Sequence, residues 1–364
     1  MAAPRPNRRD FLKGKAAAQA VEQIAGQVAD ALAENLPPIE PDHYLVKFSR
    51  RAMACQFELW LNAGEHPNGA VAAIEALDLV EQLEQQLTVY REDSEVSELN
   101  RTASLDAIEV EARLFGLLQQ SVELWRTTQG AFDITAGPLT ELWGFKRRAG
   151  RLPEASDVTE VLSRVGSQYL VLDAERHTVK FSREGVEINL GAIGKGYAVD
   201  RCAESLAAAG VSNYLFHAGN SSVLARGGNA SRNDGAWSVG VRNPLKPERY
   251  LGELLVRERA LSTSGSGTQF FIREGKRYGH ILDPRTGWPV EDVLSTTVLA
   301  PTAAEAEALS TAFYVLGPET TERLCSQFAK VGCVMLCPGK AAGSVVTHVF
   351  NLSPEEWSTQ QVDA

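Results

Sequence analysis

The sequence of 364 residues lacks several features that would point to a particular class of protein. It has no basic block beyond its first fifteen residues, and its formal net charge is −10. Both properties argue against nucleic acid as a partner, because nucleic-acid-binding proteins present clustered lysine and arginine. There is also no internal repeat and no low-complexity segment. Any binding of phosphate groups must therefore come from local features of one site.

The cysteines and the apolar runs argue against further classes of protein. Five cysteines, an odd number, occur without C-x-x-C spacing, so the sequence indicates neither a zinc site nor a complete disulfide framework. Cys333 and Cys337 lie in an apolar run and are expected in the core of a strand. No run approaches the ~20 apolar residues that a membrane span needs, so no transmembrane segment is predicted.

The first 42 residues stand apart from the rest. The stretch "NRRDFLKGKAAAQA" resembles a twin-arginine export signal at Arg8 and Arg9, but the apolar stretch that such signals need is interrupted. From Val21 to Leu32, apolar residues recur at the spacing of an amphipathic helix. A working signal would place the protein on the periplasmic or cell-envelope side. Without one the protein would be cytoplasmic, and the sequence leaves both possibilities open.

A proline-rich stretch, "ENLPPIEPD" (34–42), predicts a linker before the folded body. With 44% hydrophobic and 23% charged residues, the chain can bury a sizeable core. We expect one folded body over residues 43–352, followed by a C-terminal tail at 353–364.

Hydrophobic periodicity predicts an α+β fold of mostly antiparallel sheets packed with helices. Helical patterns occur at 68–88, 110–129, 195–209, 302–316 and 319–328. Short runs bounded by turn residues predict strands at "CQFELWLN", "QYLVLD", "TVKFS", "VEINL", "NYLFHA", "WSVGVR", "GELLVR", "QFFIRE", "STTVLA" and "CVMLCP". Consecutive hairpin-like strands with few helices between them favour this class over a doubly wound parallel sheet.

A glycine-rich turn follows an apolar run in "INLGAIGKGYAVD" (188–200) and leads into a helix. The free N–H groups and the positive end of such a helix suit a phosphate group, and Lys195 would add a cation. The spacing is not that of a nucleotide triphosphate loop, and a glycine-rich turn is often only a turn. Both interpretations remain open.

The helical stretch "AEAEALSTAF" (304–313) places Glu307 and Thr311 at i and i+4, on one helix face. A carboxylate and a hydroxyl there could hold Mg²⁺, which prefers oxygen ligands. Alternatively, Glu307 favours the helix dipole and Thr311 hydrogen bonds back to the preceding turn.

Two further stretches contain polar residues among turn or aromatic residues. In "YGHILDPRTG" (278–287), His280 and Asp283 flank a strand end, and a histidine beside a phosphate could act as a general base. A lone histidine is more often structural. In "GAFDITAGPLTELWGF" (130–145), Asp133 is an acid among aromatic side chains that could equally be core.

Seven segments, taken in order, resemble the ApbE family of FAD:protein FMN transferases. They run from about residue 45 to residue 340 and are far more specific together than any one alone. The resemblance implies an ApbE-like (T-fold-like) architecture. The segments are "RAMACQFELWL", "VYREDSEVSELN", "GAFDITAGPLTELWGF", "NLGAIGKGYAVD", "ALSTSGSGTQFF", "HILDPRTGWPV" and "EALSTAFYVLG".

The resemblance also implies a reaction. FAD would lie in a cleft with Mg²⁺ on its diphosphate, and FMN would pass to a Thr or Ser hydroxyl of an acceptor protein while AMP leaves. His280 would act at the diphosphate, with Asp283 as the other catalytic candidate. Mg²⁺ would be held by the Ala192 carbonyl, Glu307 and Thr311. The residues expected to contact FAD are Met53, Tyr90, Ala131, Phe132, Asp133, Asn189, Lys195 and Ile281.

Three positions depart from the family pattern. Asn189 stands where the family has Asp, Asn220-Ser221 where it has Gly-Asp, and Glu307 where it has a metal-binding Asp. Glu307 keeps the charge with a longer reach, but the other two changes each remove a carboxylate. Two alternatives therefore stand beside the transferase: an FAD diphosphatase that gives FMN and AMP, and an FAD-binding protein with impaired catalysis.

Overall fold

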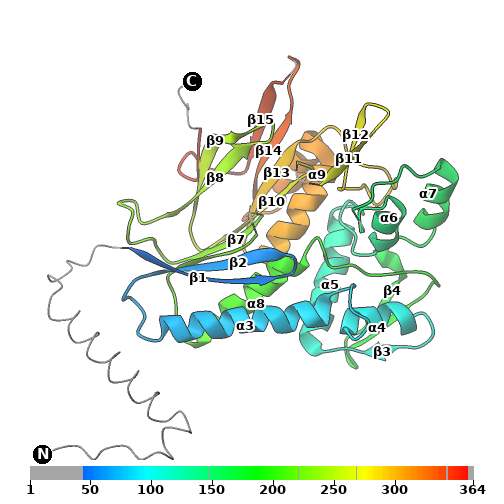
Figure 1. Cartoon of the computed structure of the whole chain (residues 1–364), viewed down its shortest axis with the longest axis horizontal. Coiled ribbons are helices and arrows are strands. Elements are labelled where there is room, and N and C mark those ends of the chain that lie inside the picture. The colour runs from blue at the N-terminus through cyan, green and yellow to red at the C-terminus, as the bar shows by residue number, and fades with distance from the viewer. Residues whose placement is uncertain (1–43, 147, 220, 268, 342, 360–364) are drawn as a thin grey trace, which may run out of the picture. The chain divides into compact units, whose positions relative to one another are not determined.

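A computed structural model describes residues 44–359, except 147, 220, 268 and 342 (Figure 1). The twin-arginine-like segment, the amphipathic pattern and the proline-rich linker lie outside the described residues. Within them, no helix is both long enough and apolar enough to span a membrane. The five cysteines are free, and Cys333 and Cys337 are buried in a strand as predicted.

The main sheet contains eight antiparallel strands in the order β1-β2-β6-β7-β10-β13-β14-β15, which confirms the α+β class (Figure 1). Every neighbouring pair is antiparallel, as the hairpin-like pattern of the sequence predicts. The strands are β1 (Leu45–Ala52), β2 (Cys55–Asn62), β6 (Tyr214–Ala218), β7 (Ser222–Arg226), β10 (Ala260–Gly265), β13 (Ser295–Ala300), β14 (Gly332–Pro338) and β15 (Val345–Phe350).

Both faces of this sheet are covered, because successive side chains of its central strands point alternately into two apolar clusters. In β14, Met335 packs in the larger cluster with the helices α3 (Gly69–Leu87), α8 (Gly194–Ala208) and α9 (Ala303–Cys325). Its neighbours Val334 and Leu336 pack in a second cluster with a smaller sheet. That sheet has the order β16-β9-β8 and comprises β8 (Trp237–Asn243), β9 (Lys246–Val256) and β16 (Trp357–Ser358).

Helix α9 carries the predicted metal residues and has a break near its middle. Gly317 has φ 72°, a left-handed value that glycine adopts without strain, and Pro318 follows it. The break separates two helical stretches, in agreement with the two patterns predicted at 302–316 and 319–328. The first stretch begins after Thr302, whose side chain accepts a hydrogen bond from the Glu305 N–H at 3.2 Å.

Smaller elements complete the body. A third apolar cluster, centred on Trp143, joins α6, α7 and the hairpin β11–β12. The remaining helices are α4 (Glu95–Thr102), α5 (Ala112–Thr127), α6 (Gly137–Leu142), α7 (Ala155–Leu162) and the 3-10 helix Ser167–Tyr169. The remaining strands are β3 (Ile108–Glu109), β4 (Leu170–Asp173), β5 (Thr178–Phe181), β11 (Phe270–Arg273) and β12 (Lys276–Gly279).

Two expectations differ from the structure. The run "VEINL" (186–190) forms no strand, because the Asn100 side chain takes the place of a strand partner. Its amide donates to the Ile188 carbonyl at 2.9 Å and accepts from the Ile188 N–H at 2.8 Å. Secondly, the expected tail at 353–364 contains β16, in which Trp357 pairs with Leu254 of β9. The folded body therefore extends beyond residue 352.

Candidate functional site

A cleft of about 430 Å³ opens where the start of α8, the start of α9 and the segment after β12 meet. A smaller hollow of about 220 Å³ adjoins it and shares Tyr90, Asn189 and Lys195 in its lining. Met53 lines only the smaller hollow. The other predicted residues, except Asp283, line the larger cleft: Tyr90, Ala131, Phe132, Asp133, Asn189, Ala192, Lys195, His280, Ile281, Glu307 and Thr311.

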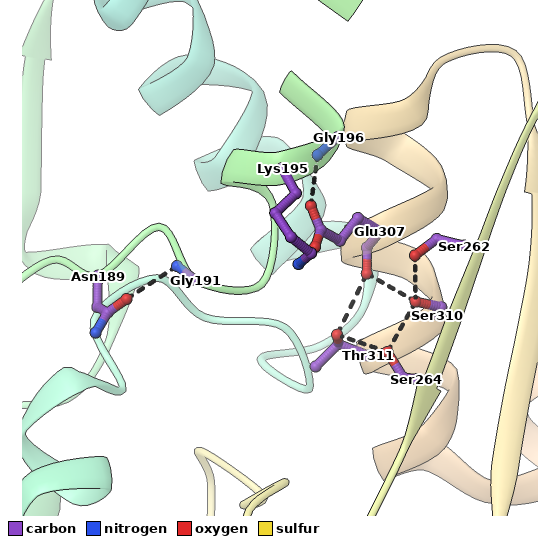
Figure 2. Close-up of polar contacts among 9 residues, drawn as sticks. All are labelled: Asn189, Gly191, Lys195, Gly196, Ser262, Ser264, Glu307, Ser310 and Thr311. Carbon is purple, nitrogen blue, oxygen red and sulfur yellow. Dashed lines mark hydrogen bonds and ion pairs between the residues drawn. The ribbon is translucent and has the colours of Figure 1, made fainter. Parts of the chain in front are cut away.

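The start of α8 packs directly against the start of α9. Gly196 allows this approach, since a Cβ at this position would overlap the carbonyl group of Ala303. The turn before α8 is fixed by Asn189, whose Oδ1 accepts a hydrogen bond from the Gly191 N–H at 2.9 Å (Figure 2). The glycine-rich turn therefore lies beside the cleft, which Gly191, Ala192 and Lys195 line.

Glu307 connects the two helices. Its side chain is only 4% exposed, and its carboxylate accepts a hydrogen bond from the Gly196 N–H at 2.6 Å (Figure 2). The other carboxylate oxygen is paired with the Lys195 ammonium group. Glu307 thus points from α9 toward α8 and places a buried carboxylate at the cleft. Its contacts therefore go beyond an interaction with the dipole of its own helix.

Thr311 lies one turn further along α9. Its hydroxyl donates back to the Glu307 carbonyl at 3.2 Å, as a back-bonded threonine does, and is also within 3.1 Å of the Ser264 hydroxyl. Ser264 in turn lies 2.8 Å from the Ser310 hydroxyl. Thr311 therefore belongs to a group of hydroxyls next to Glu307 (Figure 2).

The sequence did not predict that β10 contributes serines to this cluster of hydroxyls. Ser262 and Ser264 alternate along β10 and face α9, where the Ser310 hydroxyl donates toward Ser262 at 3.4 Å. The period-two spacing of these serines in "ALSTSG" was the available signal. It points to a shared face of a strand but does not say which helix covers that face.

His280 is held from one side only. Its backbone N–H and its Nδ1 both approach the Gln269 carbonyl, at 3.2 and 3.1 Å. Since that carbonyl can only accept, Nδ1 carries the proton and Nε2 keeps a lone pair. Nε2 has no protein partner among the described residues. Burial lowers the pKa of His280 below 6.5, opposed by the Gln269 contact and reinforced by Lys195, so the ring is neutral at pH 7.

Asp283 is placed differently from His280. Its carboxylate accepts hydrogen bonds from the backbone N–H, Nε and Nη2 of Arg285, all between 2.8 and 2.9 Å, and it does not line the cleft. Its carbonyl accepts from the Gly287 N–H at 2.7 Å. Both groups serve the turn that follows His280, so the structure favours a structural role for Asp283.

Asp133 borders the cleft, but its oxygens are used within the protein. They accept from the N–H and hydroxyl of Thr135 at 2.8 and 2.6 Å and from the N–H and hydroxyl of Ser167 at 3.0 and 2.7 Å. Burial raises the pKa of Asp133, and the same hydrogen bonds oppose that increase. The residue therefore fixes the loop that carries Ala131 and Phe132.

The turn between β1 and β2 forms one wall of the smaller hollow. Met53 and Ala54 have φ values of 48° and 58°, which are unfavourable for residues with a side chain. This two-residue hairpin turn requires positive φ at both positions, and the long strand pairing on either side holds it in place. Tyr90, 71% exposed, lies at the junction of the two spaces.

A larger cavity of about 1040 Å³ lies between α5 and α8, but its side chains indicate no particular ligand. Its lining carries three arginines and three acids, and salt bridges join Arg113 and Arg201 to Glu204 and Arg226 to Glu258; the third acid is Asp200. The cleft, in contrast, collects a helix N-terminus, an ammonium group, a neutral histidine and several hydroxyls.

Asp200 of α8 caps the helix that carries Glu307. Its carboxylate accepts hydrogen bonds from the Ala303 and Ala304 N–H groups, both at 2.8 Å. We predict that Asp200→Ala lowers the free energy of unfolding by about 1–2 kcal/mol, because two N–H groups at the start of α9 lose their acceptor. Urea denaturation measures this change, and Glu204→Ala, an exposed acid on the same helix, is the control. Equal losses in the two variants would contradict the capping role.

The α+β body thus has a cleft that brings together the start of α8, Lys195, Glu307 and His280. Comparison with known proteins gives the family. The ApbE family model matches residues 53–335, and the chain belongs to this family.

Relatives from several bacteria support this assignment. The chain is 29% identical over 306 residues to the FAD:protein FMN transferase of Haemophilus influenzae, covering 81% of this chain and 88% of the relative. It is 32% identical over 303 residues to the protein of the same name from Treponema pallidum, covering 76% and 80%. For the FAD:protein FMN transferase of Escherichia coli K12, the identity is 32% over 247 residues, covering 66% and 70%.

Solved structures confirm the fold. The ApbE protein of Thermotoga maritima superposes with a TM-score of 0.75 at 26% identity, covering 84% of this chain and 97% of that one. The apo form of the flavinyl transferase ApbE of Pseudomonas stutzeri gives a TM-score of 0.74 at 28% identity, covering 86% and 97%.

Proposed function

We propose that this protein transfers FMN from FAD to a Ser or Thr hydroxyl of an acceptor protein and releases AMP. The family and the names of the relatives support a flavin transferase. The observation that carries the proposal for this chain is that Lys195, Glu307 and a neutral His280 line one cleft beside the N-terminus of α8. That combination suits a diphosphate and a reacting hydroxyl.

In the proposed reaction, the acceptor hydroxyl oxygen attacks the phosphorus on the FMN side of the FAD diphosphate. A new P–O bond forms, and the bond from that phosphorus to the oxygen bridging to AMP breaks. His280 Nε2 accepts the hydroxyl proton, which requires the neutral ring that burial favours. Lys195 and the positive end of the α8 dipole would stabilise negative charge on the phosphate oxygens.

The residues at the cleft fit Mg²⁺. Glu307 provides a buried carboxylate, Thr311 a hydroxyl and Ala192 a carbonyl, which are all oxygen donors. Among the described residues, no group of three His, Cys, Asp or Glu side chains could hold a metal. A single carboxylate with neutral oxygen donors is a set that Mg²⁺ takes, since Mg²⁺ commonly binds one or two carboxylates together with substrate phosphates and water. When bound, it would neutralise diphosphate charge.

A labelling experiment tests the proposal. The protein is incubated with FAD, Mg²⁺ and candidate acceptors, beginning with proteins encoded beside its gene. We expect a fluorescent acceptor band on a denaturing gel and AMP in equal amount. Chromatography of the free flavins distinguishes the alternatives: FMN and AMP without a labelled acceptor would indicate a diphosphatase, and unchanged FAD would indicate a binding protein without catalysis.

The rate should depend on pH through His280. Because burial lowers its pKa below 6.5, the general-base form predominates at pH 7 and is lost only under more acidic conditions. We predict a single-turnover rate whose acid limb has its midpoint below pH 6.5, and the limb should disappear in His280→Gln. The same shift makes the free energy of unfolding fall as the pH drops below 6.5, because the unfolded chain binds the proton more tightly. A midpoint above 6.5 would contradict the assignment.

A further inference from the structure

A groove of about 470 Å³ lies next to the cleft. It shares Phe145 and Gln269 in its lining with the cleft, so the two spaces adjoin at these residues. Gln269 also links the two walls, because its side-chain amide donates to the Phe145 carbonyl at 3.1 Å. We call this space the hairpin groove; it is lined by Phe145, Arg148, Ala149, Gly150, Gln269, Phe270 and Phe271.

The hairpin groove follows the edge of β11 opposite β12, with which no other strand of the described residues pairs. It is lined by β11 residues and by none of β12, so it lies on the side of β11 that faces away from its partner strand. The His280 N–H donates to the Gln269 carbonyl, which makes this a hydrogen-bonded pair of the hairpin. Antiparallel pairing alternates, so Phe271 is again bonded to β12, whereas Phe270 and Ile272 direct their N–H and C=O groups outward.

The hairpin is anchored on one face and apolar on the other. Phe271 and Tyr278 stack on each other with ring centroids 5.2 Å apart and pack beside Trp143. On the opposite face, Phe270 is 43% exposed and Ile272 is 66% exposed. The hairpin stands at the margin of the body, next to α6 and α7 (Figure 1). An apolar strand with an open edge tends to pair with other chains unless it is protected.

The charge of this region favours an acidic partner. The hairpin from 270 to 279 carries three basic residues, Arg273, Lys276 and Arg277, against one acid, Glu274. Lys276 is paired with Glu291 outside the hairpin at 2.7 Å, so the hairpin together with this partner carries a net charge of +1, three basic residues against two acids. Arg148 adds a further cation on the opposite wall of the groove. This local excess of positive charge contrasts with the net charge of −10 of the whole chain.

We infer that an extended, acidic segment of the acceptor protein pairs with the free edge of β11 and reaches the cleft through the hairpin groove. This inference rests on the proposed transferase function. Main-chain hydrogen bonds to Phe270 and Ile272 would hold the segment, as in other cases of strand addition. Because the groove and the cleft adjoin at Gln269, whose carbonyl binds His280, a segment in the groove would have its Ser or Thr hydroxyl near His280.

The substitution Ile272→Pro tests the edge, with Ile272→Val as the matched control. Proline removes the outward N–H without removing a hydrogen bond to β12, and proline is tolerated on edge strands. For the acceptor labelled in the experiment above, we expect KM to rise roughly 5- to 10-fold in Ile272→Pro, which is the loss of about one hydrogen bond. FAD affinity, measured by flavin fluorescence, and kcat should stay close to those of Ile272→Val. An unchanged KM would overturn the inference.

A second measurement uses the unaltered enzyme and does not depend on how well the proline variant folds. Synthetic peptides that span the labelled hydroxyl carry one N-methylated backbone amide each. Strand addition predicts that methylation weakens labelling at every second position, because alternate N–H groups face β11. If methylation at every position weakened labelling equally, the inference would be overturned while the transferase function stood. If the unaltered protein labelled no acceptor, both the inference and the proposed transferase function would fail. If the protein formed a dimer that Ile272→Pro dissociates, the edge of β11 would bind a second copy of the chain. That result would also overturn the inference.

Discussion

His280→Ala should lower the single-turnover rate of FMN transfer by roughly 10² to 10⁴, because a positioned general base contributes about that much. The affinity for FAD should barely change. Nδ1 is bound to the Gln269 carbonyl, so only Nε2 is available to the reacting groups, and an interaction made in the transition state affects kcat without affecting ground-state binding. Rate, FAD affinity and melting temperature are measured on one preparation.

The control for His280→Ala is His66→Ala. The Nε2 of His66 accepts from the Ser212 and Asn213 N–H groups at 3.4 and 3.3 Å, away from the cleft, so its loss should affect stability alone. If His280 were structural as well, His280→Ala would lower the melting temperature and loosen FAD binding while leaving the rate nearly normal. That combination would remove the assignment as a general base.

Features with a local signal were predictable from the sequence. The start of α8 and the shared face of Glu307 and Thr311 follow from the glycine-rich turn and from helical spacing, and the structure places both at the cleft. The alternation of buried residues in β14 likewise follows from its apolar run. In these cases the interaction that decides the conformation lies within about one turn of helix or a few strand residues.

Features that depend on distant partners were not predictable. The run at 186–190 has the composition of a strand, but a side chain 88 residues earlier in the chain, Asn100, occupies its backbone groups. The tautomer of His280 depends on the Gln269 carbonyl, eleven residues away across the hairpin. Asp283 is a different case, because its partner Arg285 is only two residues away, but the composition of the turn does not reveal that the two side chains pair.

The departures from the family pattern have different structural consequences. Asn189 holds the Gly191 N–H through its side-chain oxygen, an interaction that a carboxylate would also make, so the turn before α8 does not need the negative charge. Asn220 lies outside the described residues, and the adjacent Ser221 lines the cleft. Glu307 reaches both Lys195 and the Gly196 N–H from α9. The carboxylate at position 307 is therefore the buried acid on which metal binding would depend.

Glu307→Gln should reduce Mg²⁺-dependent transfer by about 10²-fold or more. The amide keeps an oxygen for the Gly196 N–H, so the contact between α8 and α9 survives, but the negative charge that attracts both Lys195 and a cation is lost. Changes in residues around a metal typically cost 10- to 100-fold in affinity or activity, and loss of an anionic ligand should cost at least as much. We expect a higher half-saturating Mg²⁺ concentration, and weaker Mn²⁺ binding in calorimetry without FAD. Glu305→Gln makes the same change two residues away and should behave as the unaltered protein. Equal Mn²⁺ affinity in the two variants would leave Glu307 as a partner of Lys195 only.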